Sequence, residues 1–212
     1  MATLRILISS METTIENAVR GRGRPRDPVI DRVVAEAALD LLAEHGYEGL
    51  TVEAVAQRAG VAKTTIYRRF GSKAELTAGA VMILAAAGRA PNAGAGSTRD
   101  SLVAILREVI RALRNTVAGQ IIPDLVGAMP SHPELIEAFA KFAEPRRAVF
   151  FEVLRRGVEN GELRPDIDFE LAADLLYGPI YYRLLVTRKP LKPSDAERIV
   201  DAVMRGKGIS PD

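Results

Sequence analysis

Apolar residues recur at every third or fourth position through most of this 212-residue chain. The repeat is clearest in residues 30–42, 102–113 and 135–158. This spacing places apolar side chains along one face of an α-helix, whereas a half-buried strand needs strict alternation, which no segment shows. The sequence therefore predicts an all-α fold of about nine helices.

Glycines and capping residues divide the first third of the chain into short helices. Thr51 is a favourable N-cap for a helix that Gly60 ends after about two turns. A third short helix then ends at Gly71. Ser72 and Glu75 form a capping box, which predicts that a fourth helix begins there and continues to about residue 87.

The second half of the chain is also expected to be helical. Residues 88–98 are small and polar, which predicts a loop. Pro145 is expected to bend or split the long segment that contains it. Further helices are expected at residues 102–113, 121–129, 135–158, 169–186 and 193–205.

The composition excludes several classes of protein. With 48% hydrophobic residues, the bulk of the chain can form a core. No stretch is apolar for long enough to cross a membrane, so we expect a soluble, cytoplasmic protein without a membrane partner. The chain has no cysteine, and its histidines are His45 and His132. We therefore expect no metal site, no cofactor and no catalytic residue, and hence no enzyme.

Basic residues are concentrated locally, although the net charge is only +2. Four arginines lie within residues 20–26, and residues 54–74 contain five basic residues and no acid. Such patches indicate a polyanionic partner on one face of the protein. On charge alone, an ordinary solvated surface is an equally good interpretation.

Residues 51–70 have the pattern of a helix-turn-helix, with a tight turn at Gly60. This arrangement sets the second helix at a steep angle, so that it can enter the major groove of DNA. Ile66 and Phe70 are expected to face inward. Donors for bases and phosphates would then face outward from Lys63, Thr64, Tyr67 and Arg68, with Thr65 at the boundary. The alternative is an ordinary helical corner with a solvated face.

The segment GYEGLTVEAVAQRAGVAKTTIYRRFGSKAEL at residues 46–76 resembles the DNA-binding domain of the TetR/AcrR family of bacterial repressors. The resemblance covers about residues 28–88. Two further segments, RRGVENGELRPDID and LLYGPIYYRLLV, are similar to the ligand-binding and dimerising domain of one subgroup. The resemblance implies a basic arm at residues 1–27, a DNA-binding domain at residues 28–88 and an effector-binding, dimerising domain at residues 89–212.

The resemblance also implies roles for individual residues on double-stranded DNA. Base edges would be contacted by Lys63, Thr64 and Arg68, and phosphates by Thr51, Thr65, Tyr67 and Lys73. Thr51 could instead serve only as a helix cap, and Lys73 could be solvated. Arg24 and Arg26 would enter the minor groove from the arm, unless the arm is a basic tail that only attracts DNA nonspecifically.

For the second half, the resemblance implies a small-molecule effector and a homodimer. The guessed walls of an effector pocket are Phe139, Phe142, Phe150 and Tyr177, which favour an apolar or aromatic ligand, although core packing explains most such aromatic stripes. The residues expected at the dimer interface are Leu176, Ile180, Leu184, Ile199 and Val203. The alternative for residues 169–186 is a core helix within one subunit.

The function that follows is a dimeric transcriptional regulator, usually a repressor, that a ligand releases from a palindromic operator. Two other classes remain open. A nucleoid-like DNA-binding protein would need no effector, and a helical enzyme or carrier protein would leave the basic helix-turn-helix without a role.

Overall fold

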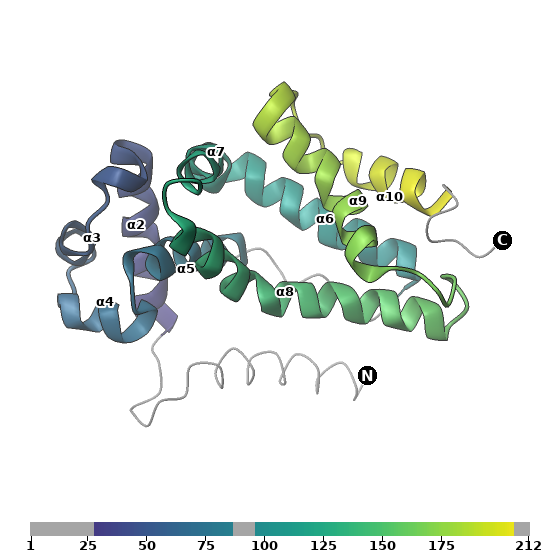
Figure 1. Ribbon diagram of the computed structural model, residues 1–212, viewed down its shortest axis with the longest axis horizontal. Coiled ribbons are helices and arrows are strands. Elements are labelled where there is room, and N and C mark those ends of the chain that lie inside the picture. The colour runs from purple at the N-terminus through teal and green to yellow at the C-terminus, as the bar shows by residue number, and fades with distance from the viewer. Residues whose placement is uncertain (1–27, 87–95, 206–212) are drawn as a thin grey trace.

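The protein is described here from a computed structural model, which covers residues 28–86 and 96–205. Within these two ranges there are nine α-helices and no strand, so the predicted all-α fold is confirmed (Figure 1). In chain order the helices are α2 (Pro28–Gly49), α3 (Val52–Ala59), α4 (Lys63–Phe70), α5 (Lys73–Ala86), α6 (Thr98–Asn115), α7 (Ala118–Ala128), α8 (Pro133–Glu159), α9 (Phe169–Tyr182) and α10 (Asp195–Arg205).

The short helices begin and end where their local chemistry dictates. The Thr51 hydroxyl oxygen accepts a hydrogen bond from the Ala54 N–H at 3.1 Å, which caps the start of α3. Gly60 ends α3 in the left-handed conformation, with φ of 66°, which glycine adopts without a steric penalty. The Ser72 hydroxyl oxygen similarly accepts from the Glu75 N–H at 3.1 Å and caps α5. These caps confirm the boundaries expected from the sequence.

A first hydrophobic cluster fills the end of the molecule that contains α2 to α5. Its members include Leu39 from α2, Ile66 from α4 and Leu76 from α5. Helices α7 and α8 also contribute, through Leu125 and Leu135. The core of this end is therefore completed by residues from the second half of the chain. The boundary expected between residues 88 and 89 lies outside the described residues.

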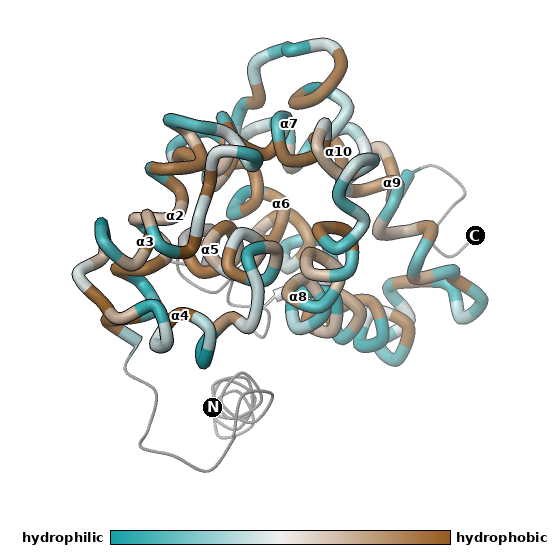
Figure 2. The backbone as a smooth tube through the Cα atoms, turned by 60° about the vertical axis from the view of Figure 1, so that its left-hand side comes forward, coloured by the Kyte–Doolittle hydropathy of each residue, from teal (hydrophilic) through white to brown (hydrophobic). Residues whose placement is uncertain are grey.

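A second cluster is formed by α6, α9, α10 and the second half of α8, and it includes Leu106, Leu154 and Leu176. Helix α8 spans both clusters and runs along the length of the molecule in Figure 1. It continues unbroken through Pro145, so the expected split does not occur, although proline cannot donate the usual backbone hydrogen bond there. Figure 2 shows hydrophobic and hydrophilic residues alternating along the helices, as amphipathic packing requires.

Helix α9 is followed directly by a π-helical turn, η1 (Arg183–Thr187), which ends at Arg188. Together they cover the single helix that the sequence predicts for residues 169–186. None of the described helices is long and apolar enough to span a bilayer.

Candidate nucleic-acid interface

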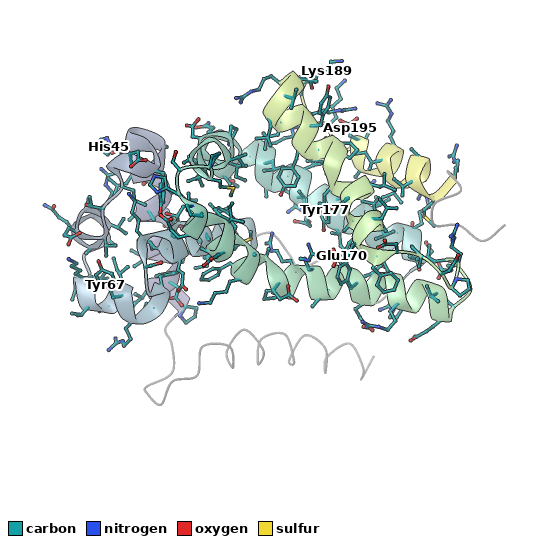
Figure 3. All side chains as sticks on the ribbon, in the orientation of Figure 1. His45, Tyr67, Glu170, Tyr177, Lys189 and Asp195 are labelled. Carbon is teal, nitrogen blue, oxygen red and sulfur yellow. The ribbon has the colours of Figure 1, made fainter. Side chains whose placement is uncertain are left out.

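Helix α4 presents a polar, basic face to solvent at one end of the molecule. Ile66 and Phe70 are buried beneath it, four residues apart on its inner side. The residues exposed on its outer side are Lys63, Thr64, Tyr67 and Arg68, as the sequence predicts, and Thr65 is half-buried between the two faces. Figure 3 shows Tyr67 on α4 at the end of the molecule farthest from α10. The outer face of α4 therefore carries hydrogen-bond donors and no acid.

Two ion pairs that the sequence reasoning missed fix α3 and α4 on α2. Arg58 of α3 donates two hydrogen bonds to the Glu44 carboxylate, at 2.6 and 2.8 Å. Arg69 at the end of α4 pairs with Asp31 in the first turn of α2. Both acids lie outside the acid-free stretch, so a search within residues 54–74 could not find them. These two arginines position the helix-turn-helix.

Lys63 is exposed but already paired within the protein. Its ammonium bonds to the Glu53 carboxylate and lies 5.5 Å from the centroid of the Tyr67 ring. The hydrogen bond from Lys63 lowers the pKa of Glu53, and the same bond raises the pKa of Lys63. Both groups are thus charged at neutral pH, and Lys63 must leave Glu53 before it can bond to a base.

Thr51 and Lys73 lie beside the helix-turn-helix, and each makes a contact within the protein. Thr51 is exposed, and its hydroxyl oxygen accepts the capping bond, so its O–H remains able to donate. The Lys73 ammonium lies 4.3 Å from the centroid of the Tyr47 ring and 3.4 Å from the Glu48 carbonyl oxygen. Lys73 therefore braces the turn that precedes α3.

The predicted arginine arm, with Arg24 and Arg26, lies outside the described residues. The first described residues do fix where the chain enters α2. Asp31 pairs with Arg69 at the end of α4, so the start of α2 lies against α4. An arm that precedes Pro28 would join the protein beside the basic helix.

Comparison with known proteins decides the family. The family described as "Bacterial regulatory proteins, tetR family" matches residues 34–80, which include both α3 and α4. The family described as "Tetracyclin repressor-like, C-terminal domain" matches residues 93–203, more than half of the chain. The chain belongs to the TetR family of transcriptional regulators. The family consists of DNA-binding regulators and not of enzymes.

Individual relatives within the TetR family agree over nearly the whole chain. An uncharacterized HTH-type transcriptional regulator of Bacillus subtilis, YdeS, is 36% identical over 87% of this chain and 93% of its own. A DNA-binding transcriptional repressor of Mycobacteroides abscessus is 33% identical over 79% of this chain and 87% of its own. The crystal structure of the TetR-family regulator SCO0332 is similar, with a TM-score of 0.67 and 32% identity, over 84% of this chain and 97% of that one.

In this TetR-family protein, the four aromatic residues expected around an effector do not form one group. Phe139 and Phe142 pack against the first hydrophobic cluster, beside α5. Phe150 and Tyr177 belong to the second cluster, with ring centroids 5.5 Å apart. They lie on either side of the middle of α8, a separation that the aromatic pattern alone could not show.

The residues expected at the dimer interface lie largely inside their own subunit, which corrects that assignment. Leu176 and Ile180 are fully buried in the single chain, and Ile199 is nearly so. Leu184 and Val203 are partly buried against the same second cluster. Their side chains already have partners within the subunit, so they are not available to a second copy.

The apolar residues that α9 leaves in solvent lie on its other face. Leu171, Leu175, Tyr182 and Val186 are 53%, 43%, 59% and 64% exposed. Separations of four and seven residues put them on one stripe, with Gly178 between them. The stripe is offset by about one residue from the expected one, and we call it the α9 stripe below.

Proposed function

We propose that this regulator is a dimeric repressor that binds a palindromic operator and is released from it by a small ligand. The observation that carries the proposal is the acid-free outer face of α4, set on a helix-turn-helix that ion pairs fix to α2. The name of the Mycobacteroides abscessus relative, a transcriptional repressor, supports the negative sign of regulation.

Helix α4 reads sequence by placing its outer face in the major groove. Lys63, Thr64 and Arg68 face the base edges, and Arg68 bonds guanine in bidentate fashion. Arg68 suits this role because it is exposed and no acid is paired with it among the described residues. The hydroxyls of Tyr67, Thr51 and Thr65 donate to phosphates and set the register of the helix.

The second subunit covers the α9 stripe. Four large apolar residues on one helix face lose contact with water when an identical stripe packs against them across a two-fold axis. Such an axis places two copies of α4 side by side, and each copy reads one half-site of a palindrome. Because α9 also packs on α6 and α10, a shift of α9 can alter the separation of the two reading helices.

The effector occupies the second half of each subunit, and its apolar or aromatic body contacts the hydrophobic side chains there. Helix α8 joins this half to the DNA-binding end, since α8 contributes to both clusters. A ligand that favours one arrangement of α8 and α9 therefore changes the equilibrium between DNA-binding and released forms, by the difference between its affinities for the two.

Electrophoretic shift and footprinting on DNA from upstream of the protein's own gene test the proposal. We expect a symmetric protected site and an affinity at least about 1,000-fold above that for random DNA of equal length. Metabolite extracts from the source cells should abolish the shift. Equal affinity for specific and random DNA would instead indicate a nucleoid-like protein, and a shift that no extract affects would remove the ligand from the proposal.

A further inference from the structure

A cation interrupts the apolar face of α8 at its midpoint. Phe142, Arg146 and Phe150 are spaced by four residues and therefore lie on one side of the helix. Phe142 packs against the first hydrophobic cluster, and Phe150 is fully buried in the second. Arg146 thus lies between the two clusters, on the side of α8 that faces the interior.

Arg146 nevertheless keeps contact with solvent. The residue is exposed, although Phe142 one turn before it is half-buried and Phe150 one turn after it is buried. Surrounding protein lowers the pKa of the guanidinium by desolvation. A group that is enclosed by protein yet reached by water must project into a recess.

Two tyrosines of α9 share this recess with Arg146. Tyr177 contacts Phe150, and Tyr181 follows one turn later on the same side of α9. Tyr181 is 39% exposed, yet burial raises the pKa of its hydroxyl, which is the same combination that Arg146 shows. Both hydroxyls interact electrostatically with the guanidinium. Figure 3 shows Tyr177 in the middle of the C-terminal half.

No acid balances the charge of Arg146 among the described residues, and the groups that act on it are Tyr177 and Tyr181. Its neighbour Arg147 points to another side of α8, where it pairs with Glu170 and lies 5.3 Å from the centroid of the Phe151 ring. A partly desolvated cation without a counter-ion is unfavourable. An anion from outside the chain would remove that cost.

We propose that the recess between α8 and α9 binds the carboxylate of a small organic acid, with Arg146 as the counter-ion and the hydroxyls of Tyr177 and Tyr181 as hydrogen-bond donors. The apolar body of the acid lies along Phe142 and Phe150. This inference rests on the proposed ligand response and names its chemical class, a carboxylic acid with an aromatic or alkyl body.

The donor set fits a carboxylate in both shape and charge. The planar guanidinium can donate two parallel hydrogen bonds to the two carboxylate oxygens. A single guanidinium with two neutral hydroxyls balances one negative charge, which is the charge that a carboxylate carries at pH 7. A phosphate monoester, with close to two negative charges, would be left undercompensated.

Direct binding to the full chain tests the proposal, with octanoate, benzoate and phenylacetate as probes beside their primary amides. We expect at least one acid to raise the Tm and to bind in calorimetry, whereas its amide does neither. Arg146→Met should weaken that acid about 10- to 100-fold, because a charge-assisted pair is lost. Arg146→Lys keeps the charge without the planar fork and should lose less. Tyr177→Phe and Tyr181→Phe should each cost a few-fold.

Arg147→Met is the matched control, because it removes the neighbouring arginine and should leave acid binding unchanged. Binding of the amides as tightly as the acids, acid binding that survives Arg146→Met, or no binding of any acid to the wild type would each overturn the proposal. So would dissociation of the dimer by Arg146→Met with acid binding retained, because Arg146 would then belong to the subunit interface.

Operator binding separates this inference from the proposed function. Without any acid, Arg146→Met should bind operator DNA as the wild type does, and the acid should release only the wild type. Acid binding by a wild type that fails to bind an operator would remove the repressor function and keep the recess. Release from the operator by neutral compounds alone would keep the repressor and remove the recess.

Discussion

The two ends of the molecule expose their functional surfaces in opposite ways. At the DNA-binding end, α4 buries Ile66 and Phe70 and exposes hydroxyls and positive charge. At the other end, α9 buries Leu176 and Ile180 and still exposes a further apolar stripe, which includes Leu175. The first surface suits a charged, hydrated partner, and the second suits another apolar surface.

The difference teaches which surfaces a sequence can assign. A helix with one apolar stripe has a single way to face the core, so the outer side of α4 follows from Ile66 and Phe70. A helix that is apolar on several sides can face the core with any of them. For α9, only the packing of α6 and α10 against it determines which side remains outside.

The largest expected effect comes from placing a charge on the α9 stripe. Leu175→Glu should abolish the dimer, because it buries an unpaired carboxylate in the interface at a cost of about 3–5 kcal/mol. Operator binding should fall with it, since a single subunit reads only one half-site. Sedimentation and operator titration measure both effects. A dimer of normal strength would place the interface elsewhere and break the contrast between the two ends.

The adjacent residue provides the converse experiment. Leu176→Ala should lower the free energy of unfolding by about 3 kcal/mol, because it removes a fully buried side chain from the second cluster. The strength of the dimer should change little where the variant remains folded. Denaturant unfolding gives the first quantity and sedimentation at low denaturant the second. A variant that loses the dimer but keeps its stability would return Leu176 to the interface.

On the basic face, Arg68→Ala should weaken operator binding by about 1–3 kcal/mol and relax the preference at one base pair in each half-site. Competition with operators changed at single positions measures both. Equal weakening on operator and on random DNA would make Arg68 a phosphate contact. The free energy of unfolding should stay the same, because Arg68 is exposed and packs on nothing in the core.

The local features of the fold could be predicted because they depend on nearby residues. The caps at Thr51 and Ser72 and the turn at Gly60 each involve groups within about four positions of one another. The outer face of α4 could be assigned for the same reason. The pairing of Arg58 and Arg69 with α2 could not, because the partner acids lie many residues away and follow no spacing rule.

The second half was less predictable because its sites depend on how separate helices meet. The aromatic stripe of α8 indicated one pocket, but the helix contacts two clusters and divides Phe142 from Phe150. A signal was present in the sequence: Arg146 lies midway between these two phenylalanines on one helix face. A cation at such a position marks either a buried ion pair or an opening, and only the arrangement of α9 distinguishes the two.

A smaller effect is expected at the pair that holds Lys63. Glu53→Gln should raise affinity for all DNA sequences by a few-fold at most, because Lys63 no longer has to leave a carboxylate to reach DNA. Glu36→Gln removes the same charge from α2, where Glu36 pairs with Arg32, and is the matched control. An equal gain in both variants would show a general effect of net charge and leave the Lys63–Glu53 pair without a specific role.

The smallest expected effect lies where the two ends of the molecule meet. His132, just before α8, contacts Glu48 at 2.5 Å and Glu134 at 3.1 Å, and its ring packs edge-on against Tyr47 at 4.9 Å between centroids. The hydrogen bond with Glu48, followed by that with Glu134, raises the pKa of His132 above its usual 6.5. The protonated imidazole therefore stabilises the folded state fully below pH 6.5, and this stabilisation is lost as pH rises through the higher folded pKa. His132→Gln should remove that pH dependence, whereas His45→Gln, which changes the other histidine of the chain, should preserve it. Denaturant unfolding of the wild type and both variants at several pH values makes the comparison. A wild type whose stability changes no more than that of His132→Gln would mean that this junction holds the two ends together by packing on Tyr47 alone.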